Sequence, residues 1–131
     1  MPPDPSRLWS FLVVGYLLAV AIEVPVLLVG LSRRHSLGAR LVAGLWLTAC
    51  TYPIVVVVLP YLVWKPYGRP MYIAVAETFA VVTECVLFWL VFRAEDSQKV
   101  KPHLRRSVLR DLTAIVVANL CSFFVGTIVR W

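Results

Sequence analysis

Three carboxylates interrupt long apolar runs of this sequence and are its strongest candidates for chemistry. Glu23 lies in the run 8–31, and Glu77 and Glu84 lie in the run 71–92. A charged side chain at the centre of a membrane span costs about 2.5–3.5 kcal/mol even on a permissive insertion scale, so such residues normally face other helices. Glu77 and Glu84 are seven residues apart, which is about two helical turns, so they share one face.

Further polar residues fall at a similar depth in the other apolar runs. At a helical rise of about 1.5 Å per residue, Glu23, Glu84 and Asn119 lie near mid-membrane, and Thr48 and Thr51 join them. Every run therefore contributes a polar group to one interior layer. Such a layer predicts binding or conduction of a proton, a cation or a small polar ligand, with the candidate binding residues Glu23, Glu77, Glu84, Asn119, Thr48 and Thr51.

The same layer has two other interpretations. Buried Glu hydrogen-bonded to Asn or Thr can hold helices together without any ligand, and the chain would then be a non-catalytic accessory or scaffold subunit of a larger membrane complex. An enzyme is less favoured, because the sequence has no nucleophile elbow, HExxH motif or phosphate-binding glycine loop. We expect no cofactor, and the sequence leaves a metal site open.

The composition sets the fold class. The chain has 131 residues, of which 60% are hydrophobic, far above the roughly 45–50% of a soluble domain. Four runs approach or exceed the roughly 20 residues that a membrane-spanning helix needs, and they cover 8–31, 41–64, 71–92 and 112–129. We therefore predict an all-α polytopic membrane protein, a four-transmembrane-helix bundle forming one domain over residues 1–131. Its partner is the lipid bilayer, and no segment remains for binding nucleic acid.

The beginning of the chain has some features of a secretory signal. Arg7 precedes the first apolar run, and Ala19-Val20-Ala21 has the small-x-small form of a cleavage site. The apolar run nevertheless continues to Leu31, and Arg33 and Arg34 follow it as a stop. We expect a retained span.

The basic residues predict the orientation. Nine lie in the first and third connections, and only four lie on the opposite side (Arg33, Arg34, Arg40, Arg93, Lys99, Lys101, Arg105, Arg106 and Arg110 against Arg7, Lys65, Arg69 and Arg130). Positively charged loops stay in the cytoplasm, so both termini are expected outside, in a plasma (inner) membrane. The third connection is also a candidate site for anionic lipid, at about 1 kcal/mol per basic residue. His35 and His103 fall in the two basic connections and are expected to be solvated.

Prolines and cysteines complete the pattern. Pro53 and Pro60 should break the hydrogen-bond ladder of the second run, and Gly68 should form a tight turn between the second and third runs. The three cysteines, which lack CxxC spacing, are expected to be packing residues (Cys50, Cys85 and Cys121). A bundle this short would need self-association or a partner membrane protein to enclose a pathway, so we expect a homo-oligomer or a complex.

The uneven distribution of basic residues makes the topology testable. Reporter domains fused after Trp131 or within residues 66–70 should report an outside location, and fusions within residues 97–101 should report inside. A cytoplasmic signal from the fusion after Trp131, in a chain that keeps its N-terminus, would contradict the four-span topology.

Overall fold

The computed structural model describes residues 4–96 and 102–129, and all regular elements within these ranges are helices. In chain order they are α1 (Pro5–Gly30), α2 (Leu37–Pro53), η1 (Ile54–Val58), η2 (Pro60–Trp64), α3 (Lys65–Tyr67), α4 (Arg69–Asp96) and α5 (Pro102–Val129). Four helical stretches within the described ranges are long and apolar enough to cross a membrane, namely Ser6–Gly30, Leu37–Tyr67, Arg69–Phe92 and Arg105–Val129. The predicted all-α architecture with four such helices is confirmed.

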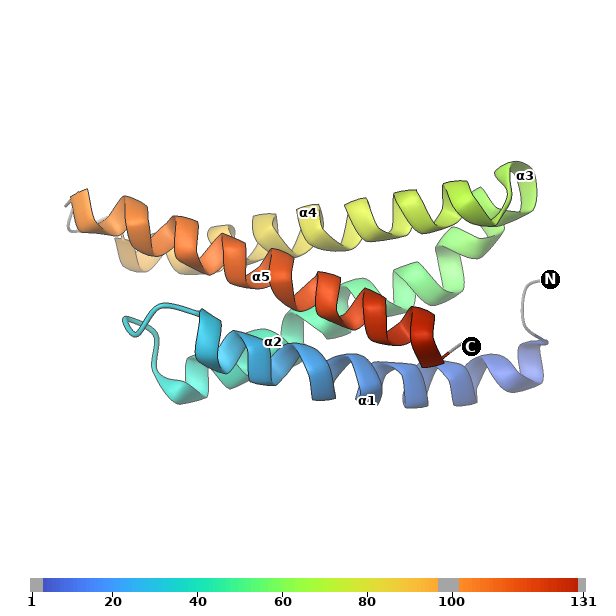
Figure 1. Cartoon of the computed structure of the whole chain (residues 1–131), viewed down its shortest axis with the longest axis horizontal. Coiled ribbons are helices and arrows are strands. Elements are labelled where there is room, and N and C mark those ends of the chain that lie inside the picture. The colour runs from blue at the N-terminus through green and yellow to red at the C-terminus, as the bar shows by residue number, and fades with distance from the viewer. Residues whose placement is uncertain (1–3, 97–101, 130–131) are drawn as a thin grey trace.

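The four long helical stretches form an elongated bundle (Figure 1). Helix α1 packs against α2 and α5, and α4 packs against α2 and α5. The start of α1 and the end of α5 lie at the same end of the bundle as α3 (Figure 1). We call this the α3 end. The connection between α1 and α2, which contains His35, lies at the opposite end, which we call the His35 end.

The C-terminus of α1 is stabilised by two arginines that the sequence analysis treated only as topological signals. The Nη1 group of Arg40 donates to the carbonyl oxygen of Leu28 at 2.7 Å, and Nε of Arg110 donates to that of Gly30 at 3.0 Å. The last carbonyl groups of a helix have no intrahelical partner and carry partial negative charge. These contacts therefore satisfy α1 and attach it to α2 and α5.

The second apolar run is helical throughout, but its geometry changes after the first proline. Pro53 ends α2, and the π-helical elements η1 and η2 follow, the second of them beginning at Pro60. Proline lacks the N–H that an α-helical ladder requires, and local π-helical adjustments can satisfy the backbone groups that it frees in membrane helices. Gly68 has a φ of 84° and ends α3, so the expected turn before α4 is confirmed.

The apolar core occupies the His35 half of the bundle. It is formed by eight buried residues from all four long helices, which are Leu27, Leu31, Ala43, Leu47, Phe88, Ala114, Ile115 and Ala118. Many other large apolar side chains face outward, such as Val29, Leu62 and Ile128. A bundle with an apolar exterior is compatible with a surrounding of hydrocarbon rather than water.

The close approach of α1 and α2 generates a stability prediction. A Cβ atom on Gly44 would lie 2.8 Å from Cγ2 of Val24 and 3.4 Å from its Cα, whereas a Cβ on Gly126 meets nothing within 4 Å. Gly44→Ala should therefore lower the free energy of unfolding by about 1–3 kcal/mol, the usual cost of overpacking. Gly126→Ala is the matched control and should be neutral or stabilising, because alanine favours helix. Denaturant titration in detergent measures both, and equal effects would contradict this packing.

Candidate functional site

The predicted polar layer is assembled by hydrogen bonds between the long helices. The hydroxyl of Thr48 donates to the carboxylate of Glu23 at 2.7 Å, which joins α2 to α1. The carboxylate of Glu84 on α4 accepts from Thr51 Oγ1 at 2.7 Å and from Asn119 Nδ2 at 2.8 Å, on α2 and α5 respectively. All five side chains are buried. The structure therefore brings together five of the six candidate residues predicted from the sequence.

The two threonines give this layer more than one hydrogen-bonding arrangement. Thr48 Oγ1 lies 2.8 Å from the carbonyl oxygen of Gly44 as well as 2.7 Å from Glu23. Thr51 Oγ1 likewise lies 3.1 Å from the carbonyl oxygen of Leu47 and 2.7 Å from Oε1 of Glu84. A hydroxyl has one proton to donate and can also accept. If Glu23 carries a proton, it can donate to Thr48 while Thr48 donates to its own helix, so the contact is preserved in both states.

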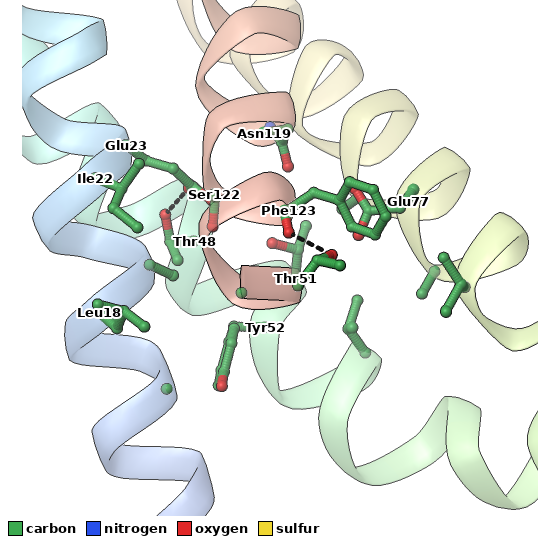
Figure 2. A pocket seen from close by; sticks show the side chains of 18 of the residues that line it. Leu18, Ile22, Glu23, Thr48, Thr51, Tyr52, Glu77, Asn119, Ser122 and Phe123 are labelled. Carbon is green, nitrogen blue, oxygen red and sulfur yellow. Dashed lines mark hydrogen bonds between the residues drawn. The ribbon is translucent and has the colours of Figure 1, made fainter. Parts of the chain in front are cut away.

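A cavity of about 440 Å³ lies between the layer and the α3 end. All six predicted residues line it, and Figure 2 shows five of them, Glu23, Thr48, Thr51, Glu77 and Asn119, together with Ser122 and Phe123 of α5. The sequence analysis missed most of the remaining polar lining, which is Tyr52, Arg69, Tyr72, Ser122 and Thr127. None of the eight core residues lines the cavity. The layer is therefore its floor.

Glu77 differs from the other two carboxylates of the cavity. It is half-buried on α4, seven residues before Glu84, and lines the cavity nearer its α3 end. Within the part of the chain that the structure describes, no hydrogen bond or ion pair reaches its carboxylate, whereas Glu23 and Glu84 both accept hydrogen bonds from threonine. Among the described residues, Glu77 is thus the cavity carboxylate that has no hydrogen-bond or ion-pair partner.

Aromatic side chains form the wall near the α3 end. Trp64 stacks on Tyr72 with ring centroids 5.3 Å apart, and the Tyr72 hydroxyl donates to the carbonyl oxygen of Val55 at 3.0 Å. Tyr52 meets Tyr16 edge to face at 6.3 Å. Trp64, Tyr72 and Tyr52 line the cavity. The site therefore combines carboxylates with aromatic faces, both of which attract cations.

A second polar centre lies at the His35 end and corrects one expectation. His35 was expected to be solvated, yet it is only 5% exposed. Its Nε2 lies 3.0 Å from Oδ2 of Asp111, and its ring packs edge-on against Phe92 with centroids 4.7 Å apart. The expectation is wrong because the His35 ring packs against Phe88 and Phe92 of α4 and contacts the buried carboxylate of Asp111. The side chain of His103 lies outside the described residues.

Asp111 is the centre of this second cluster. Its carboxylate accepts from the backbone N–H of Ser32 at 2.6 Å and from Arg34 at 3.1 Å, in addition to the contact with His35. No role was predicted for Asp111 from the sequence. Its spacing gave only a weak signal, because residue 111 precedes Asn119 by eight positions, which places the two about 80° apart around the helix.

The cysteines and carboxylates show no metal-binding geometry. Cys50, Cys85 and Cys121 are half-buried free thiols. Across the described ranges, no group of three or more His, Cys, Asp or Glu side chains is placed to hold a metal ion. Glu23 and Glu84 both belong to the polar layer, whereas Glu77 lines the cavity nearer the α3 end.

The fold and the site define a class, a helical bundle with four helices apolar enough to span a membrane and a polar internal cavity. No family model matches the chain, and neither the curated proteins nor the solved structures contain a significant match. Function must therefore be argued from the cavity itself.

The cluster around Asp111 predicts a large loss of stability when its carboxylate is removed. Asp111→Ala leaves the Ser32 N–H, Arg34 and His35 without their acceptor, and breaking a buried charged pair costs about 3–5 kcal/mol. Asp111→Asn keeps one acceptor oxygen and should lose less. Thermal unfolding in detergent compares the two, and the exposed Asp4→Asn is the control. Equal stability of Asp111→Ala and the wild type would contradict a structural role for the cluster.

Proposed function

We propose that this chain is an integral membrane protein whose cavity binds a cation or a small polar ligand that enters from the α3 end. One observation carries the proposal: polar residues from four long helices, selected by depth and phase alone, line a single cavity. With the termini outside, as the basic residues predict, the cavity would open to the cell exterior.

The charge of the lining favours a cation. Three carboxylates line the cavity (Glu23, Glu77 and Glu84), against one basic residue, Arg69. A cleft lined mainly by one sign of charge and enclosed by apolar walls concentrates counter-ions. Glu77 has no hydrogen-bond or ion-pair partner among the described residues, and it lies nearer the α3 end, so an incoming cation would meet it before the hydrogen-bonded floor.

The accessory-subunit interpretation rests on a different observation. The carboxylates of Glu23 and Glu84 both have hydrogen-bond donors within the bundle, so the floor is a stable polar contact without any ligand. A subunit of this kind would keep the floor for packing, and its cavity would be closed to solutes by a partner helix or a second copy of the chain.

Thiol labelling separates these alternatives without a known ligand. In a background with the three native cysteines replaced, Ser122→Cys places a thiol in the cavity, and Tyr67→Cys provides an exposed reference at the α3 end. A cationic methanethiosulfonate reagent should modify Ser122→Cys roughly tenfold faster than an anionic one, after normalisation to Tyr67→Cys. Adding Glu77→Gln should reduce this preference.

Two results would overturn the proposal. One is a Ser122→Cys thiol that reacts with neither reagent while Tyr67→Cys reacts with both, because solutes would then not reach the cavity. The other is equal rates for the two reagents that Glu77→Gln leaves unchanged.

A further inference from the structure

The carboxylates of the cavity are separated along its length. Glu77 and Glu84 both line the cavity on α4 and are seven residues apart in the sequence, which corresponds to about 10 Å along a helix axis. In the described part of the chain, no three acidic or metal-ligating side chains converge on one point. A single small ion can therefore neutralise one of these two carboxylates but cannot contact both.

On α4, the lining between the two carboxylates is apolar. Ala80 lies between Glu77 and Glu84 on the same helix face and lines the cavity, and Phe123 of α5 lines it as well. Figure 2 shows Phe123 and Glu77 among the side chains that line the cavity. Along α4, the cavity wall is thus acidic at Glu77, apolar at Ala80 and acidic again at Glu84.

The two acidic positions differ in what already surrounds them. Glu84 is held by Thr51 and Asn119 in the floor, with Glu23 at the same level, so the floor presents fixed carboxylate oxygens. Glu77, nearer the α3 end, has no such support. A ligand with a charge at each end would pair with both, and the aromatic rings of Trp64 and Tyr72 on the cavity wall also attract cations.

From this arrangement we infer that the ligand is an elongated organic dication, a linear diamine or polyamine. One ammonium group pairs with Glu84 at the floor, the other pairs with Glu77, and the alkyl chain lies along Ala80 and Phe123. The volume of about 440 Å³ accommodates such a chain and lies within the usual range for small-molecule sites. The inference rests on the proposed function and specifies its ligand class.

The chain length of the ligand provides the test. Purified protein in nanodiscs of neutral lipid is titrated with linear α,ω-diaminoalkanes of increasing length and with n-alkylamines of matched length, and the dissociation constants are compared. Affinity should peak at about seven or eight methylene groups, which span about 10 Å, the helical rise from residue 77 to residue 84. At that length the diamine should bind roughly a hundredfold more tightly than the monoamine, because its second contact is intramolecular.

Variants assign the two ends. Glu77→Gln removes a carboxylate without hydrogen-bond partners, so the fold should be retained and the diamine should fall to the affinity of the monoamine. Glu84→Gln should have the same effect. Asp4→Asn is the matched control, because it removes an exposed negative charge at the N-cap of α1. It should leave the diamine preference unchanged.

The outcomes separate this inference from the proposed function. The dication is wrong if affinity rises steadily with chain length in both series, or if the diamine preference survives Glu77→Gln. The proposed function would still stand in either case if the Ser122→Cys thiol reacted faster with the cationic reagent. Absence of any amine binding together with equal labelling rates would overturn both.

Discussion

The hydrogen bonds to the carboxylate of Glu84 determine much of the arrangement of this bundle. Thr51 and Asn119 donate to it from two other helices, and the side chain is buried in the bundle. Because an unpaired buried carboxylate is very costly, α2, α4 and α5 must approach one another at this level. The contact between Thr48 and Glu23 imposes the same constraint on α1. The four long helices are therefore joined at the polar layer, with the apolar core on one side of it and the cavity on the other.

The cavity lies beside the segment in which the second apolar run leaves regular α-helix. Thr48 and Thr51 contact the layer from α2, and Pro53 ends α2 two residues after Thr51. The π-helical turns that follow end at Trp64, which stacks on Tyr72 of α4 at the cavity wall. The proline-dependent change of helix geometry comes directly after Thr48 and Thr51. It thus separates the tightly packed part of the bundle from the part that contains the cavity.

The layer could be predicted from sequence because two regular quantities determine it. Helical rise gives the depth of Glu23, Glu84 and Asn119, and helical phase gives the shared face of Glu77 and Glu84. The cavity could not be predicted, since its volume depends on how far the helices diverge beyond Pro53, and the same uncertainty concealed Arg69 as a lining residue. His35 was misjudged for another reason. A polar residue in a connection is usually solvated, and only its pairing with Asp111, 76 residues away in sequence, shows otherwise.

The two polar centres of the bundle differ in how fully their acidic groups are paired. Asp111 has contacts from a backbone amide, Arg34 and His35, so it stabilises the His35 end and leaves no carboxylate for a ligand. Glu77 has no such contacts and lines the cavity. The eight residues of the apolar core lie between the two levels, so a ligand that entered from the α3 end would stop at the polar layer. Passage through the bundle would require that core to separate. Under the proposed function, this conformation would therefore suit binding from one side rather than conduction.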